Sequence, residues 1–299
     1  MRFTTINPRD IAVPKLHGYL LGSIGPRPIA FVSTIDEEGN HNLSPYSFFN
    51  VFSANPPTAI FSPARRGRDN TTKHTYENAK ATMEVVINVV NYDIVQQMSL
   101  SSTEYAKGVN EFEKAGLTPI ASEIVRPMRV KESPVQLECT VREVVELGTE
   151  GGAGNLIISE VKLIHINEDV LDENGRVDQT KIDLVGRMGG NWYVRAHGEA
   201  MFEVAKPLTT LGIGVDRIPY DIRHSTILTG NDLGQLGNVE ALPDETDVNE
   251  FRLLELADLF VEYEDQSAEL EMELHKKAHE YLASGQVNEA WKTLLSFNN

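Results

Sequence analysis

Two long strand-like stretches, Val135 to Leu147 and Leu156 to Ile166, flank the glycine-rich segment 148–154. This arrangement predicts a β-hairpin, because glycine permits the tight reversal between antiparallel strands. Four shorter strand-like runs precede the hairpin: 29–35, 47–52, 58–61 and 83–90. Helix-like pieces are few and do not alternate regularly with strands. A doubly wound parallel sheet is therefore disfavoured, and a closed antiparallel barrel is expected.

Helical additions are expected within this β-rich part and again near the C-terminus. Three short helices are predicted at 72–80, 92–99 and 111–115. The character of the chain changes after about Lys206, where an irregular segment precedes three amphipathic patterns. We therefore predict a β domain at 1–205 and a helical extension at 206–299.

Asp247, followed by Glu250, resembles a capping box and predicts the start of the first C-terminal helix. The apolar faces of the three helices are expected to be Leu253, Leu256, Ala257 and Phe260, then Leu270, Leu274, Ala278, Tyr281 and Leu282, then Val287, Ala290, Trp291, Leu294 and Leu295. The last two helices resemble one tetratricopeptide hairpin. Because one such unit cannot bury its own face, we expect it to pack on the barrel or on a second subunit.

The charge of the chain limits the classes of partner that it can bind. The formal net charge of −17 disfavours broad attraction to nucleic acid or anionic lipid. No apolar run approaches the roughly 20 residues of a membrane span, and the N-terminus lacks a signal peptide pattern. The only cysteine, Cys139, is expected to be a buried strand residue rather than a nucleophile. We expect a cytoplasmic protein that binds neither nucleic acid nor membrane.

The segment Arg65 to Thr75 gathers basic residues, hydroxyls and a predicted helix start in an otherwise acidic chain. A phosphate dianion requires cations, hydroxyl donors and the free amides of a helix N-terminus. A solvated surface loop explains this stretch equally well when it is taken alone. The Walker pattern is missing from the sequence, which disfavours a nucleoside triphosphate.

Two further segments favour a ligand. Residues 22–34 end in the paired hydroxyls of Ser33 and Thr34, and residues 42–50 place hydroxyls and amides beside aromatic side chains. A flat amphipathic ring with hydrogen-bonding edges needs a wall of this kind.

Several of these segments together resemble the flavin reductase-like family of FMN-binding split barrels, in order and in spacing. The matching segments are 26–34, 42–50, 73–78, 86–88 and 184–193. The resemblance spans roughly residues 15–200. It implies a six-stranded antiparallel split barrel, mainly β with α additions, in a homodimer. It also implies FMN near the subunit interface and NADH or NADPH as co-substrate.

The resemblance also implies roles for individual residues. Ser33, Thr34, Asn42, Ser44, Tyr46 and Ser47 would line the flavin ring and ribityl chain. Phe61 and Ser62 would approach from the next strand, and Lys73 and Thr75 would hold the phosphate. Asn78 matches the motif either as a contact or as a brace for the helix. His74 stands where the family often has an acidic residue, which alters the local charge.

The predicted function is that of an NAD(P)H-dependent flavin oxidoreductase, which passes electrons to a small-molecule acceptor or a partner enzyme. An FMN-dependent oxidase or oxygenase, and a non-catalytic flavin-binding regulatory module with the acidic tail as its partner surface, remain as alternatives. The sequence lacks a complete dinucleotide fingerprint, so the nicotinamide is expected to stack on the flavin in a shallow site. Arg187 either contacts the dinucleotide or braces the Gly189–Gly190 turn.

Three histidines receive structural interpretations. His197 could approach the nicotinamide, but we favour a hydrogen-bonded barrel residue. His275 and His279 lack the glutamate of a zinc protease motif between them, so a solvated helix face is expected. We predict no metal site.

Overall fold

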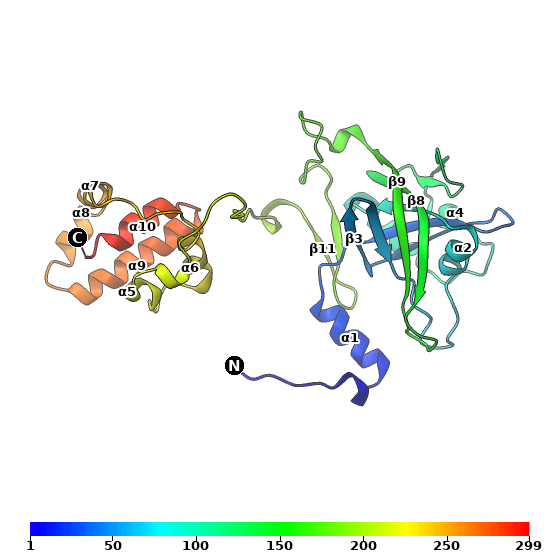
Figure 1. Cartoon of the computed structure of the whole chain (residues 1–299), viewed down its shortest axis with the longest axis horizontal. Coiled ribbons are helices and arrows are strands. Elements are labelled where there is room, and N and C mark those ends of the chain that lie inside the picture. Colours follow the sequence, from blue (N-terminus) through cyan, green and yellow to red (C-terminus); the bar gives the residue numbers. More distant parts are fainter. Residues whose placement is uncertain (299) are drawn as a thin grey trace. The chain divides into compact units, whose positions relative to one another are not determined.

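The computed structural model describes residues 1–298 and divides the chain into two compact units, Met1–Phe202 and Glu203–Asn299. The first unit is built around one sheet, and the second is helical (Figure 1). Within residues 1–298, no helix combines the length and the apolar character needed to cross a membrane.

Seven strands form one antiparallel sheet in the first unit, in the order β2-β1-β5-β8-β9-β4-β3. Their bounds are β1 Ala30–Ile35, β2 His41–Tyr46, β3 Phe49–Ala54, β4 Pro57–Phe61, β5 Glu84–Val89, β8 Val135–Glu146 and β9 Asn155–Ile166. The predicted mainly β architecture with added helices is confirmed, but the sheet has seven strands instead of six. The strand missed from the sequence is β2, which contains Pro45; a proline is tolerated there because β2 lies at the edge.

The two edge strands are neighbours in the sequence. β2 ends at Tyr46 and β3 begins at Phe49, although they lie at opposite ends of the hydrogen-bonded order. Their ends can be no more than about 11 Å apart, since three consecutive Cα–Cα steps of about 3.8 Å join them. The sheet must therefore curl. Within residues 1–298 no ladder pairs β2 with β3, so closure of this curled sheet into a barrel stays a prediction.

Smaller elements complete the first unit. The helices are α1 Val13–Ser23, α2 His74–Thr82, α3 Val95–Leu100 and α4 Glu111–Ala115, with 3-10 turns η1 Pro8–Asp10, η2 Tyr92–Ile94, η3 Glu168–Val170 and η4 Gly198–Ala200. Two short ladders pair β6 Pro119–Ile120 with β7 Arg129–Val130, and β10 Val185–Arg187 with β11 Tyr193–Arg195. The three predicted helices are confirmed as α2, α3 with η2, and α4. The helix α1 was not predicted; none of its residues is buried.

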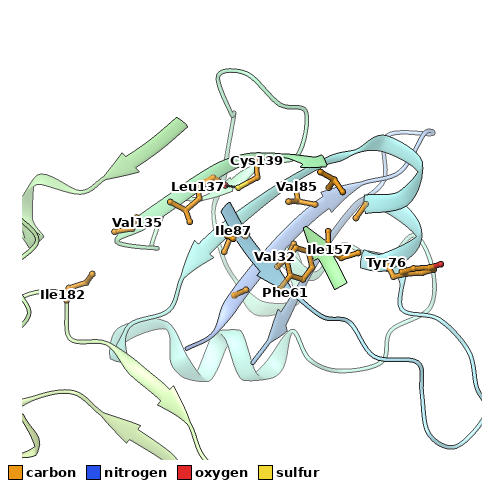
Figure 2. Packing of buried hydrophobic residues seen from close by; sticks show 14 of the residues in the cluster. Val32, Phe61, Tyr76, Val85, Ile87, Val135, Leu137, Cys139, Ile157 and Ile182 are labelled. Carbon is orange, nitrogen blue, oxygen red and sulfur yellow. Dashed lines mark hydrogen bonds between the residues drawn. The ribbon is translucent and has the colours of Figure 1, made fainter. Parts of the chain in front are cut away.

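The strand β1 is buried on both faces. Ala30 and Val32 belong to one apolar cluster, and Phe31 belongs to another with the preceding Ile29. This division follows the two-residue period of a strand. Figure 2 shows the first cluster, in which Val32 packs with side chains of the neighbouring strands.

Cys139 lies in this first cluster and is fully buried on β8 (Figure 2). Burial, with a contribution from the charge of Glu138, raises the pKa of the thiol to about 12. The thiol is therefore protonated at neutral pH and is a poor nucleophile. The predicted structural role is confirmed.

The second unit is made of helices and one 3-10 turn. Their bounds are η5 Val215–Arg217, α5 Tyr220–Arg223, α6 Gly230–Leu236, α7 Glu245–Glu255, α8 Ala257–Glu262, α9 Ser267–Ala283 and α10 Val287–Leu295. The hairpin of α9 and α10 packs on the preceding segment, including Ile218, Ile222 and Leu236. Trp291 is fully buried there, and its indole Nε1 donates to the Leu236 carbonyl over 3.1 Å. The expectation that the hairpin needs the barrel or a second subunit to cover it was wrong, because its own unit supplies the cover.

The start and the face of the first C-terminal helix also differ from the prediction. Asp244, not Asp247, is the N-cap: its carboxylate accepts from the Asp247 amide over 2.9 Å. The helical stretch is interrupted at Leu256, which separates α7 from α8. Leu256 is buried, whereas Leu253 is 73% exposed and lies off the buried face.

The predicted solvated face is wrong for only one histidine of the α9 pair, because the His279 side chain is 46% exposed whereas His275 is buried. His275 is buried, and its Nδ1 lies 2.8 Å from the Ser225 hydroxyl. His279 Nδ1 lies 2.9 Å from Asp232 Oδ2, on α6. Both histidines therefore fasten α9 to the segment before it, a role that local sequence spacing does not reveal.

A chain that ends at Phe202 should stay soluble with the circular dichroism of a β protein, because the core of the first unit lies upstream. A chain that ends at Thr246 should expose Ile218, Ile222 and Leu236, which lose their α9 and α10 partners. We expect the longer truncated chain to bind an apolar dye and to aggregate in size-exclusion chromatography. Equal dye binding and equal aggregation of the two truncated chains would contradict the division into units.

Candidate functional site

A small polar hollow, with a free volume of about 20 Å3, lies in the first unit, between β2, the start of α2, and the segment before α4. Its lining consists of Asn42, Ser44, Tyr46, Arg66, Lys73, His74, Thr75, Ser102, Thr103, Glu104, Tyr105 and Glu111. Five of the residues predicted to bind FMN are in this set, and they come from two separate sequence motifs.

The two-residue period of β2 explains why these side chains gather. Asn42, Ser44 and Tyr46 alternate along the strand and therefore share one face, which lines the hollow. Leu43 points to the opposite face and is fully buried in the second apolar cluster. One strand thus supplies both a polar wall and a core residue.

A chain of side-chain hydrogen bonds fixes α2 to this wall. The Tyr46 hydroxyl donates to Thr75 Oγ1 over 2.8 Å, and Thr75 Oγ1 donates to Asn42 Oδ1 over 2.6 Å. Asn78 Nδ2 donates to Thr34 Oγ1 over 3.1 Å, and Thr34 lies 3.4 Å from the same Asn42 oxygen. Asn78 is therefore a brace between α2 and β1.

Glu111, the first residue of α4, closes the inner side of the hollow. Its carboxylate accepts from Asn42 Nδ2 over 3.0 Å and from the Leu43 amide over 2.9 Å. The side chain is buried, and this burial raises the pKa of the carboxyl in spite of the two hydrogen bonds. Glu111 thereby fastens α4 to β2.

Three cations gather at the outer side of the hollow around the carboxylate of Glu104. Arg66 Nε lies 3.2 Å and Lys73 Nζ 3.4 Å from Glu104 Oε1, while Arg68 pairs with Glu104 Oε2. Burial by itself would raise the pKa of the Glu104 carboxyl. The neighbouring cations, of which Lys73 has the largest effect, outweigh burial and lower this pKa. Arg65 turns elsewhere and donates to Asn70 Oδ1 over 2.7 Å.

Three predicted ring-wall residues do not line the hollow: Ser33, Thr34 and Ser47. Ser33 and Thr34 are consecutive on β1 and so point to opposite faces. The Ser33 hydroxyl donates to the Met128 carbonyl, away from Asn42. Ser47 Oγ accepts from Arg27 Nε over 3.4 Å. Their contact with a flavin stays a prediction.

Phe61 and Ser62 lie at the end of β4 and just after it, and both are buried. The Phe61 ring lies in the first apolar cluster, 5.7 Å from the Tyr46 ring, and so supports the wall of the hollow from behind. The Ser62 amide donates to the Phe48 carbonyl over 2.9 Å. Neither residue lines the hollow in this structure.

Arg187 braces the turn between β10 and β11. Its Nη1 donates to the Trp192 carbonyl over 3.0 Å, and its guanidinium lies 4.6 Å from the centre of the Tyr193 ring. His197 Nδ1 lies 3.7 Å from Asp183 Oδ1, too far for a hydrogen bond, and the side chain is 47% exposed, so its predicted hydrogen-bonded role stays a prediction. A dinucleotide contact by Arg187 stays a prediction.

The donor set of the hollow fits a phosphate group. Lys73 and Arg66 supply positive charge and Ser44 supplies a hydroxyl, whereas the hydroxyl of Thr75 already donates to Asn42. Lys73 is also the N-cap of α2, so the positive end of the helix dipole lies beside the hollow. The Lys73 side chain makes no capping hydrogen bond to the helix. The hollow therefore holds donors of the kind that a phosphate group requires, at present paired with Glu104.

Sequence reasoning missed both carboxylates of the hollow. Glu104 and Glu111 lie far along the chain from the basic motif, so no local spacing connects them with Lys73. The hydroxyl-rich run Ser101-Ser102-Thr103 was the available signal for this segment, since Ser102 and Thr103 line the hollow.

The profile of the flavin reductase-like domain matches residues 22–181 of this chain. A protein of Aquifex aeolicus is 40% identical over 189 residues, which cover 63% of this chain and 94% of the relative. A protein of Halalkalibacterium halodurans is 34% identical over 204 residues, which cover 68% and 96% respectively. The chain belongs to the flavin reductase-like family. Membership implies flavin binding.

Solved structures agree with this assignment. Nitrilotriacetate monooxygenase component B from Bacillus cereus is 32% identical with a TM-score of 0.64, covering 68% of this chain and all (100%) of that one. A Shewanella frigidimarina protein described as a flavin reductase with a split barrel domain is 27% identical with a TM-score of 0.58, covering 69% and 100%. These proteins correspond in length to the first unit alone. The second unit therefore lies largely outside the shared part.

Replacing Thr75 by Val should destabilise the protein by about 1–3 kcal/mol, because Asn42 loses a donor and the Tyr46 hydroxyl loses its acceptor. Thr75 is 1% exposed, so water cannot easily replace the lost hydroxyl. Urea unfolding measures the effect. Thr82→Val is the matched control, since Thr82 lies in the same helix and donates back to the Asn78 carbonyl of that helix over 2.9 Å; comparable losses would contradict the assigned network.

Proposed function

We propose that this protein is an FMN-binding oxidoreductase that works as an NAD(P)H-dependent flavin reductase. The proposal depends above all on one observation: Lys73 and Arg66 stand at the start of α2 beside the hydroxyls of Ser44 and Thr75, in a flavin reductase-like chain. An acidic chain with a net charge of −17 needs such a local cluster to attract an anionic cofactor.

The proposed roles follow the places of the side chains. Lys73 and Thr75 hold the phosphate, and Asn42, Ser44 and Tyr46 form the adjoining wall. Thr34 and Asn78 act from behind by fixing that wall. The residues proposed for the ring region lie on β1, between β2 and β3, and at the end of β4: Ser33, Ser47, Phe61 and Ser62.

Bound FMN would supply the redox chemistry, taking a hydride from NADH or NADPH and passing electrons on to an acceptor. The chain itself has only to bind, orient and shield the ring, so no acid–base dyad is required. A shallow nicotinamide site fits the lack of a complete dinucleotide fingerprint in the sequence. Arg187, the last residue of β10, is proposed as a secondary contact of the dinucleotide.

A homodimer built on a split barrel is part of the proposal. Exposed apolar side chains on β3, with Val51 59% and Phe52 65% exposed, support it. Trp192, 77% exposed after β10, is a further apolar surface that a second copy could cover.

The purified protein should bind FMN, and anaerobic NADH or NADPH should bleach the flavin absorption near its visible maximum. An ultraviolet-visible spectrum before and after addition of the nicotinamide measures this. Reoxidation by air should restore the colour. A protein that binds no FMN would overturn the cofactor assignment, and one whose flavin stays oxidised would overturn the reductase assignment alone.

Replacing Lys73 by Ala should weaken FMN by about 1.5–3 kcal/mol, the usual worth of a charge-assisted hydrogen bond, and leave riboflavin nearly unaffected. The reason is that riboflavin lacks the phosphate. Flavin titration by calorimetry gives both affinities. Lys80→Ala is the control, because Lys80 lies in α2, the helix that Lys73 precedes as N-cap, but pairs with Glu146 over 2.7 Å. Equal losses for both flavins would remove Lys73 from the phosphate site.

A flavin-binding regulatory module is the second candidate, favoured by the separate helical unit that lies outside the matched length of the relatives. Residues 240–269 carry eleven acidic residues and a single basic one, which suits a cationic partner. Binding of a partner to this unit, together with failure of NADH and NADPH to reduce the flavin, would favour this candidate.

A further inference from the structure

Glu104 occupies the position that an anionic ligand would take among the cations of the hollow. Arg66, Arg68 and Lys73 all direct nitrogen atoms at its carboxylate. Thr75 and Ser44 lie in the same lining. A phosphate bound to Lys73 and Arg66 would therefore have to displace this carboxylate, since two anions cannot share the same donors without repulsion.

The segment that carries Glu104 is attached in a way that allows such displacement. Residues 101–110 join α3 to α4, and their backbone hydrogen bonds run within the segment, back to α3 or on to α4, where the Asn110 carbonyl accepts from Lys114. Ser102 N bonds the Ser99 carbonyl and Val109 N bonds the Ala106 carbonyl, over 3.1 and 3.2 Å. The ion pairs of Glu104 with Arg66, Arg68 and Lys73 thus tie this segment to the basic one, and they can break without disturbing the sheet.

The exposure of the partners sets the strength of this attachment. The Glu104 side chain is 36% exposed, and those of Arg66, Lys73 and Arg68 are 15%, 30% and 69% exposed, so only the Arg66 pair is largely sheltered from water. The other two ion pairs are weak, because water screens them. A phosphate monoester carries more charge and more acceptor oxygens than one carboxylate, so it can displace Glu104 from the cations. The net affinity for the phosphate is nevertheless lower than it would be without this competitor.

We propose that Glu104 is an internal competitor for the phosphate of the flavin, and that its carboxylate lowers the affinity for FMN without affecting flavins that lack a phosphate. This inference rests on the proposed FMN site. Glu104 thereby makes the cofactor exchangeable and reduces discrimination between FMN and riboflavin. The opposite role, in which Glu104 holds the cations ready for the phosphate, gives the opposite sign on mutation.

The test is the substitution Glu104→Gln, which keeps the shape of the side chain and removes its charge. FMN affinity should rise roughly three- to tenfold, the range expected when several partly exposed ion pairs are released, while riboflavin affinity should stay the same. Glu173→Gln is the control for the change in net charge, because Glu173 is exposed in the turn 172–175. Unchanged or weaker FMN binding by the Glu104→Gln variant would overturn the proposal.

A second measurement separates this inference from the proposed function. Inorganic phosphate should raise the melting temperature of the Glu104→Gln variant more than that of the wild type, at equal ionic strength set with chloride. If the wild type binds no FMN, the FMN assignment fails, and the phosphate result alone decides whether Glu104 competes with an anion. If FMN binds and Lys73→Ala weakens it, but Glu104→Gln changes neither FMN nor phosphate binding, only the competitor role fails.

Discussion

The carboxamide of Asn42 is the point on which the arrangement of the site depends. Its oxygen accepts from Thr75 on α2 and lies beside Thr34 on β1, while its nitrogen donates to Glu111 on α4. One side chain of β2 thus joins two helices and two strands through buried polar contacts, which are costly to leave unpaired. The start of α2, and with it Lys73, is placed by these bonds.

Much of the site follows from strand periodicity once the strands are known. The hydroxyl and amide residues of the motif at 42–50 were grouped correctly where they alternate on β2, as Asn42, Ser44 and Tyr46 do. Ser33 and Thr34 do not share a face, because neighbours on a strand point opposite ways, and their contact with a flavin stays a prediction. Glu104 and Glu111 escaped prediction since tertiary packing, not local spacing, brings them to the basic segment.

The fold could also be predicted only where the sequence has a regular pattern. The long pair β8 and β9 has a continuous pattern, and its bounds were predicted within one residue; the apolar positions of α9 and α10 were predicted equally well. The segment 206–240 has no such pattern. Its Ile218, Ile222 and Leu236 are scattered among loops and short helices, yet they cover the terminal hairpin. Burial assembled from isolated residues is invisible to a periodicity argument.

The burial of Cys139 has a practical consequence for measuring motion in this molecule. The only thiol of the chain is fully covered and has a pKa of about 12, so the native protein behaves toward maleimide dyes as if it had no cysteine. A single cysteine introduced at an exposed position between α3 and α4 would take up a fluorophore or spin label selectively. The time course of that segment during ligand exchange thus becomes accessible to spectroscopy without first removing a native residue.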